Sequence, residues 1–309
     1  MSSAPVRPAA QGEPFFLDGA PGRRFCLFHP PAGTCRGALL YVHPFAEEMN
    51  RSRRMAALQA RALAQQGYGV LQIDLYGCGD SSGDFGDARW DIWKDDLARG
   101  AAWLAARCGQ PLTLWGLRLG ALLALDHARA AAHPVAHPIA HPIAHPIASM
   151  LLWQPVTKGA AYLTQFLRLR LAGDLLDGGA AQGGTDALRQ ALRAGETVEI
   201  AGYDLAPQLA AALDGLPALE AMAPSCPVHW FEAVSAAGGA SATGGAGGAL
   251  PAGAARVADA WRERGVDLHL HALPGAPFWA TPETTVNPDW LAATCAAMER
   301  RETEQHDGV

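Results

Sequence analysis

The turn between Gly116 and Gly120 has a spacing that can hold a reactive side chain above a sheet. The apolar run LTLWG before it predicts a strand, and the apolar run after it predicts a helix. In this strand, G-x-x-x-G, helix layout the central residue is a nucleophile for acyl carbonyls, and it is Ser, Cys or Asp. Here it is Arg118. A guanidinium is always protonated and has no lone pair to attack a carbonyl, so no acyl-enzyme can form there.

A general base is also missing. Catalytic sites with this strand, turn and helix layout take their base from a histidine after the last strand. Here residues 273–288 (LPGAPFWATPETTVNP) contain no histidine, and the next one is His306. Glu232, at the end of the predicted strand 227–234, falls near the position of the catalytic acid. Because an unpaired cation beside a pocket is costly, we expect Arg118 to pair with Glu232 or to hold an anionic ligand.

Two backbone N–H groups are candidates for stabilising an oxyanion. One comes from HPFAEE, after the predicted strand 37–44. Pro44 has no N–H, so the donor there is Phe45, and the second donor is Leu119 at the start of the following helix. His43 precedes them and is expected to be a hydrogen-bonded histidine beneath the pocket rather than a base.

A Gly- and Ser-rich loop, DLYGCGDSSGDF (74–85), contains the possible alternative nucleophiles Ser81, Ser82 and Cys78. Serines in such loops usually hydrogen-bond the loop itself. Cys78 has no base beside it in the sequence, which favours an inert thiol. We therefore expect none of the three to replace the missing serine.

The segments that must position these residues alternate between short β-branched or aromatic runs and longer Ala/Leu/Arg stretches of helical period. This alternation predicts βαβ units and a mostly parallel sheet with helices on both faces. The predicted strands are 37–44, 68–77, 111–116, 149–156, 227–234 and 266–275. The predicted helices are 54–67, 93–108, 119–132, 256–265 and 288–301, and a hairpin of 14–19 and 23–30 adds antiparallel strands at one edge.

The pattern divides the chain into a core interrupted by a cap. Residues 1–157 and 223–309 are the two parts of the predicted core, and 158–222, with several predicted helices and the strand-like segment TVEIAGY, form an inserted helical cap. Residues 133–148 are four copies of H-P-V/I-A, and 236–254 are rich in Gly and Ala, so both are expected to be exposed loops. Histidines spaced in this way along polyproline-like backbone do not converge, and no metal site is expected.

The composition narrows the class of protein. Half of the residues are hydrophobic, and 24 Lys+Arg against 30 Asp+Glu give a net charge of −6. Wholesale disorder is excluded, and the lack of a basic run argues against nucleic acid as a partner. No apolar stretch is long enough to span a membrane and no export signal is visible, so a cytoplasmic location is expected. Six scattered cysteines without a C-x-x-C pair indicate reduced thiols, and no cofactor is expected.

Five longer motifs carry a resemblance to a known family. They are LWGLRLGALLAL, HPFAEEMNRSRR, DLYGCGDSSGDFGDARWDIWKDDL, LLWQPV and EIAGYDL. Together with the order of strands they resemble the exosortase A system-associated hydrolases of the second type, in the α/β-hydrolase superfamily. The resemblance covers nearly the whole chain outside 133–148 and 236–254. It implies an α/β-hydrolase fold and a cytoplasmic bacterial protein linked to exosortase-type protein sorting and exopolysaccharide production.

Three functions remain open. The chain could be a hydrolase that acts on an ester, thioester or similar acyl bond through a non-standard nucleophile. It could be a non-catalytic protein in which Arg118 binds a small carboxylate or phosphate ligand. It could also be a scaffold for the exosortase or exopolysaccharide machinery, with the cap docking a protein partner. The missing serine and histidine favour the second function and the resemblance favours the first, so the sequence leaves enzymatic activity undecided and predicts a small anionic or acyl ligand.

Overall fold

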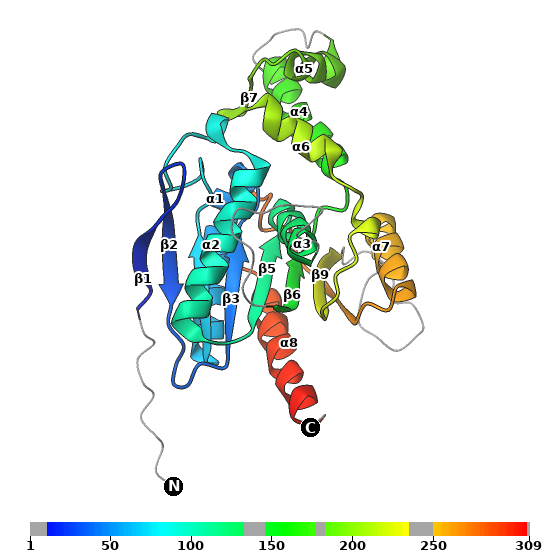
Figure 1. The fold of residues 1–309 in the computed structure, drawn as a ribbon. Helices are drawn as coiled ribbons and strands as arrows, with labels where there is room; N and C mark the ends of the chain where they lie inside the picture. The colour runs from blue at the N-terminus through cyan, green and yellow to red at the C-terminus, as the bar shows by residue number, and fades with distance from the viewer. Residues whose placement is uncertain (1–10, 133–145, 177–182, 235–249, 308–309) are drawn as a thin grey trace.

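The computed structural model describes residues 11–132, 146–176, 183–234 and 250–307 (Figure 1). The strands of its central sheet are β1 Glu13–Asp18, β2 Arg23–His29, β3 Gly37–Val42, β4 Tyr68–Ile73, β5 Leu112–Leu117, β6 Ile147–Trp153, β9 Val228–Val234 and β10 Leu268–Pro274. Their order is β1-β2-β4-β3-β5-β6-β9-β10. β2 pairs antiparallel with β1 and β4, and the remaining pairs are parallel, as predicted.

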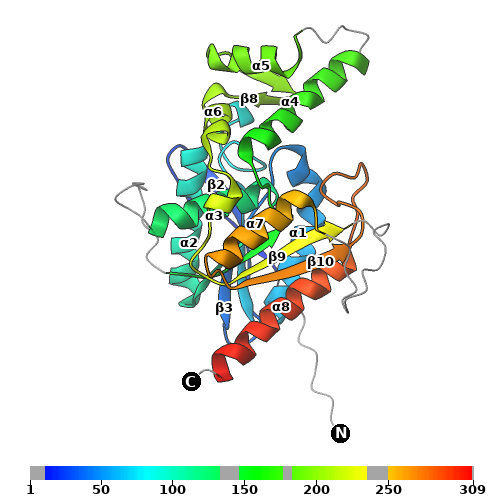
Figure 2. The ribbon, with the colours of Figure 1, turned by 90° about the vertical axis from the view of Figure 1, so that its right-hand side faces the viewer.

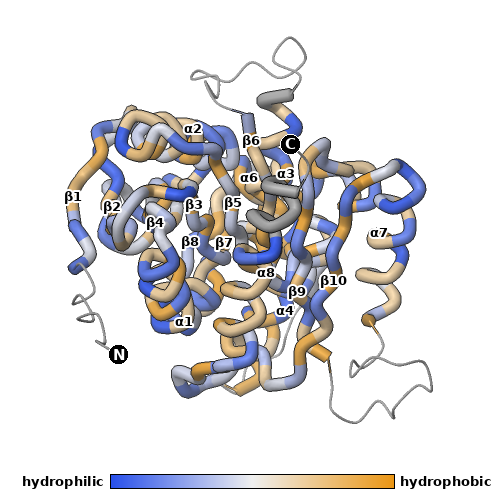
Figure 3. The backbone as a smooth tube through the Cα atoms, turned by 90° about the horizontal axis from the view of Figure 1, so that it is seen from below, coloured by the Kyte–Doolittle hydropathy of each residue, from blue (hydrophilic) through white to orange (hydrophobic). Residues whose placement is uncertain are grey.

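Helices cover both faces of the sheet. The helices of the core are α1 Glu47–Gln65, α2 Trp90–Cys108, α3 Leu119–Ala132, α7 Ala252–Glu263 and α8 Pro288–Asp307. Leu40 and Val42 of β3 pack in one hydrophobic cluster with α2 and α3, whereas Leu39 and Tyr41 pack in a second cluster with α1 and α8. This alternation is what a strand buried on both sides requires. In Figure 3, α1 and α2 accordingly lie on opposite sides of the row of strands.

The segment expected to be a cap lies beyond one end of the sheet (Figures 1 and 2). It contains α4 Gly159–Leu176, α5 Gly184–Arg193, β7 Val198–Ile200, β8 Tyr203–Leu205 and α6 Pro207–Gly215. The sequence suggested a strand at TVEIAGY. In the structure this segment does not join the core sheet but begins the two-stranded hairpin formed by β7 and β8. Its two turn residues, Ala201 and Gly202, have φ of 51° and 85°, the left-handed values that a two-residue hairpin turn needs.

Helix α1 begins at Glu47, seven residues before the predicted start at 54. The first two turns carry mostly charged and polar side chains, so the apolar period becomes visible only from Met55. The prediction therefore missed the residues that α1 presents to the carboxyl end of the sheet.

The elements that follow two predicted loops begin earlier in the chain than expected. β6 begins at Ile147, inside the predicted loop 133–148, and α7 begins at Ala252, inside the predicted loop 236–254. Residues 133–145 and 235–249 lie outside the described residues. The N-terminal hairpin is confirmed, and none of the six cysteines, all of which lie in the described residues, forms a disulfide, as their spacing indicated.

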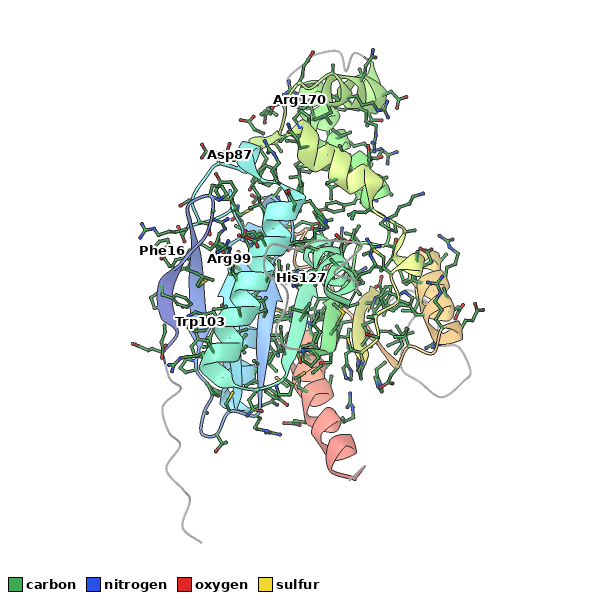
Figure 4. All side chains as sticks on the ribbon, in the orientation of Figure 1. Phe16, Asp87, Arg99, Trp103, His127 and Arg170 are labelled. Atoms are coloured by element: carbon green, nitrogen blue, oxygen red, sulfur yellow. The ribbon has the colours of Figure 1, made fainter. Side chains whose placement is uncertain are left out.

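His127 of α3 is a buried titratable group (Figure 4), and neither ring nitrogen has a hydrogen-bond partner among the described residues. Burial, with the nearby charge of Lys94, lowers its pKa from 6.5 to about 4. The unfolded chain therefore binds the proton more readily, and the free energy of unfolding falls as pH drops from about 6.5 towards 4.

We expect His127→Leu to flatten this dependence by up to about 1.4 kcal/mol per pH unit. Urea unfolding across this pH range measures the slope. An unchanged slope in the His127 variant would show that this ring is not the group that titrates.

Candidate functional site

The turn after β5 places Arg118 in the left-handed region, with φ of 54°. Two glycines allow this geometry. A Cβ on Gly116 would collide with the backbone of Ala121, and a Cβ on Gly120 would collide with carbonyl oxygens at the end of β3. The Arg118 N–H donates to the Trp153 carbonyl at 2.9 Å, so the end of β6 also holds the turn. A side chain at this φ is rare outside constrained functional turns.

The Arg118 side chain is held by three groups from three elements. Its Nε donates to Glu48 Oε1 of α1 at 3.2 Å. Its guanidinium carbon lies 5.6 Å from the ring centres of Tyr162, on α4, and Trp279, in the loop after β10. The Tyr162 hydroxyl donates to Glu48 Oε2 at 2.9 Å. The cation is thus paired with one carboxylate and flanked by two aromatic rings, an arrangement that stabilises a partly buried guanidinium.

The expected pair between Arg118 and Glu232 is therefore wrong. The Glu232 carboxylate accepts hydrogen bonds from Trp230 Nε1 and Gln154 Nε2, each at 2.7 Å. Gln154 ends β6 with φ of 44°, and its side-chain oxygen accepts the Ala233 N–H. Burial raises the pKa of Glu232, while these hydrogen bonds and the charge of Arg118 act against that rise. Glu232 is fixed within the strand ends, and Arg118 turns to α1 instead.

Glu48 lies in the first turn of α1, directly after Glu47. Negative side chains there are stabilised by the helix dipole. Burial raises the pKa of the Glu48 carboxyl, and the charge of Arg118 and the Tyr162 hydroxyl oppose the rise. Glu47 accepts the hydroxyl of Tyr203, from β8, at 3.0 Å. Consecutive carboxylates of α1 therefore bind two tyrosines of the segment expected to be a cap.

The two predicted oxyanion donors border a small cavity of about 10 Å³. It is lined by His43, Pro44, Phe45, Leu75, Cys78, Trp90, Trp93, Leu119, Gly120 and Leu123. Neither the Phe45 nor the Leu119 N–H donates a hydrogen bond to a described residue. The volume suits one water molecule at most. The Phe45 ring contacts Phe166 of α4 at a centroid distance of 4.7 Å, so α4 packs against one wall of this cavity.

His43 has both ring nitrogens occupied. Nε2 accepts the Leu75 N–H at 3.1 Å, and Nδ1 donates to the Pro44 carbonyl at 2.7 Å. Complete burial lowers the pKa of His43, in agreement with a neutral ring that accepts one hydrogen bond and donates the other. His43 therefore joins the ends of β3 and β4 and is not placed to act as a base.

The alternative nucleophiles are engaged elsewhere. Ser81 Oγ accepts the Phe25 N–H at 2.9 Å and donates to a carbonyl of its own loop. Ser82 Oγ accepts the Arg23 N–H at 3.0 Å. Burial strongly raises the pKa of the Cys78 thiol, which therefore stays protonated. The two serines attach their loop to β2, and Cys78 lines the small cavity.

Sequence reasoning missed Glu48, Tyr162, Gln154 and Trp279. Glu48 could have been found, because paired acidic residues commonly mark a first helical turn. Trp279 lies in the loop that was searched for a histidine, but nothing in a sequence indicates that its ring meets Arg118. Tyr162 and Gln154 reach the site through tertiary packing and a strained strand end, which local patterns do not reveal.

Comparisons with known proteins agree on the fold. Residues 33–173 match the family described as serine aminopeptidase, S33. A carboxyl esterase from Bacillus coagulans is 12% identical, with a TM-score of 0.60 over 94% of this chain and 98% of its own. A monoglyceride lipase variant from Saccharomyces cerevisiae is 15% identical, with a TM-score of 0.57 over 97% of this chain and 97% of its own. A proline iminopeptidase from Mycobacterium smegmatis is 13% identical, with a TM-score of 0.53 over 95% of this chain and 100% of its own. None of the curated proteins matches the chain.

The chain has the α/β-hydrolase fold, which confirms the predicted fold class. The structural neighbours differ in activity, so they define the fold and not the reaction. Among the described residues, no helix combines the length and apolar character needed to cross a bilayer. In the same residues, no group of three or more His, Cys, Asp or Glu side chains is arranged to hold a metal ion.

We expect a double-mutant cycle to measure the link between Arg118 and Glu48. Arg118→Met should lower the free energy of unfolding by about 2 kcal/mol, because it leaves the Glu48 carboxylate without its cation; both side chains are about one fifth exposed, which reduces the loss. In a Glu48→Gln background the same change should cost about 1 kcal/mol or less. Chemical unfolding provides the four values. Equal losses in the two backgrounds would show that the pair contributes nothing.

Proposed function

We propose that this chain is a binding protein on an α/β-hydrolase fold, in which Arg118 holds a small carboxylate- or phosphate-bearing ligand. One observation carries the proposal. Only Nε of the guanidinium is used by Glu48, while Nη1 and Nη2 donate to no described residue and the side chain is 18% exposed. A guanidinium edge with two N–H groups matches the two oxygens of a carboxylate or phosphate.

The lack of a standard catalytic triad supports binding rather than acyl transfer. Arg118 occupies the position of the nucleophile, and Trp279 lies against it in the loop where a base is expected. Arg118 and Trp279 both argue against acyl transfer, because an arginine cannot form an ester and an indole cannot take up a proton from a nucleophile. The flanking rings of Tyr162 and Trp279 give the ligand site apolar walls, which suits a short acyl chain with an anionic end.

Propionate and inorganic phosphate are the probes that test this proposal, with binding measured by calorimetry. Arg118→Lys should weaken propionate binding about tenfold or more, since an ammonium cannot form the paired hydrogen bonds. Glu48→Gln should strengthen it, because a neighbouring negative charge is removed. Arg54→Lys, at an exposed arginine of α1, is the matched control. Binding that is insensitive to Arg118→Lys would disprove the assignment.

Hydrolysis of an acyl bond is the second candidate function. The observation in its favour is the pair of unused N–H groups of Phe45 and Leu119, since such donors stabilise a tetrahedral oxyanion. On the binding proposal, a fluorophosphonate probe should not label the protein, and nitrophenyl esters should be cleaved only at the background rate. Labelling at Ser81 or Ser82, identified by peptide mass spectrometry, would make that loop catalytic and replace the binding proposal.

A place in the exosortase A system is a separate proposal, supported by the motifs that resemble the family. The scaffold version of it would use the end of α4, where Leu169, Leu175 and Leu176 are 51%, 64% and 88% exposed. Exposed leucines that lie close together on one helix are typical of contact surfaces. The exopolysaccharide yield of a strain that lacks the gene tests this placement, and an unchanged yield would argue against it.

A further inference from the structure

A second and larger cavity lies beneath the N-terminal half of α1, against strands β2 and β4. Its volume is about 140 Å³. Neither Arg118 nor Glu48 lines it. His43 lines both this cavity and the small one beside Phe45, so the imidazole forms a wall between them. The larger cavity is therefore separate from the site proposed above.

Several polar side chains line this cavity, and their charges balance. Asp74 Oδ2 accepts hydrogen bonds from Arg53 Nη2 at 2.9 Å and from the Asp80 N–H at 3.0 Å. Within the described chain, Asp74 Oδ1 accepts no hydrogen bond, and Nε and Nη1 of Arg53 donate none. Gln72 uses its side-chain oxygen for His29 Nε2, which leaves its amide nitrogen as a second donor. A ligand would thus meet one acceptor and several donors with no net charge.

Apolar side chains line the same cavity beside these polar groups. Phe25 and Leu27 of β2 line it together with Met49 and Ala57 of α1, and Phe25 lies next to Asp74, whose N–H donates to the Phe25 carbonyl at 2.9 Å. The Phe25 ring meets the half-exposed ring of Phe16 at a centroid distance of 5.7 Å, and Figure 4 shows Phe16 on the hairpin at the edge of the sheet. A volume of roughly 150 Å³ is large enough for one benzene ring. This cavity therefore has room for a single ring beside its apolar side chains.

We propose that this cavity binds a neutral one-ring molecule that carries a primary carboxamide. The carboxamide oxygen accepts a hydrogen bond from Arg53, and its NH₂ group donates to Asp74 Oδ1, while the ring packs between Phe25 and Met49. A carboxylate in the same place would meet the negative charge of Asp74, and an ammonium would meet the positive charge of Arg53. The cavity therefore favours a ligand that is neutral and that has both the hydrogen-bond donor and the acceptor of an amide.

Benzamide is the probe, used with the full chain and followed by ligand-observed NMR and calorimetry. We expect saturable binding with a dissociation constant on the order of 1 mM, as suits a ligand with so few atoms. Benzoate and benzylamine should bind at least about tenfold more weakly. Ala57→Leu fills the cavity from a helix position that tolerates leucine and should abolish binding. Ala62→Leu, on the same helix outside the lining, is the matched control.

Three results would overturn the proposal. They are absence of saturable benzamide binding, equal binding of benzoate, and benzamide binding that survives Ala57→Leu. If Ala57→Leu does not fold, Leu27→Phe narrows the cavity from β2 and should weaken benzamide at least about fivefold. Arg118→Lys should leave the benzamide affinity unchanged, so failure at one site is distinguishable from failure at the other.

Discussion

The close approach of α3 to the ends of β3 and β5 is the constraint on which the rest of the site depends. Gly116 and Gly120 leave no space for a Cβ, so the chain passes from strand to helix within one residue, and that residue, Arg118, must take a left-handed φ. This conformation costs on the order of 1 kcal/mol or more in a residue with a side chain. The packing of α3 against the ends of β3 and β5 requires this conformation whichever side chain stands at position 118.

A permanent cation at this position then determines its surroundings. The charge needs a nearby anion, and the strand-end acid Glu232 is already satisfied by Trp230 and Gln154. Glu48 supplies the anion from α1 and so connects the turn to a helix on the opposite side of the sheet from α3. Tyr162 binds the same carboxylate. The carboxylate that compensates the charge of Arg118 therefore also holds α4 in place through Tyr162.

The sequence predicted those features that follow from local patterns of apolar residues, and it did not predict those that depend on contacts between distant parts of the chain. The start of α3 was predicted to the residue, because apolar residues fill the helix and a conspicuous turn precedes it. The parallel strands were recognised because burial on both faces makes them continuously apolar. The start of α1 was missed because its first turns are polar. The acidic pair at the start of α1 was visible in the sequence. Its contact with Arg118 was not, because Glu48, Tyr162 and Trp279 lie far apart in the chain and meet Arg118 only through tertiary packing.

The two carboxylates at the start of α1 have a mechanical consequence. Neighbouring residues of an α-helix point about 100° apart around its axis. The hydrogen bonds from Tyr162 to Glu48 and from Tyr203 to Glu47 therefore hold the same segment of chain from two different directions. A single bond would act as a pivot, about which α4 and the β7–β8 hairpin could swing. Two bonds that are not parallel resist rotation as well as separation, so these elements can leave the core only after both bonds have broken.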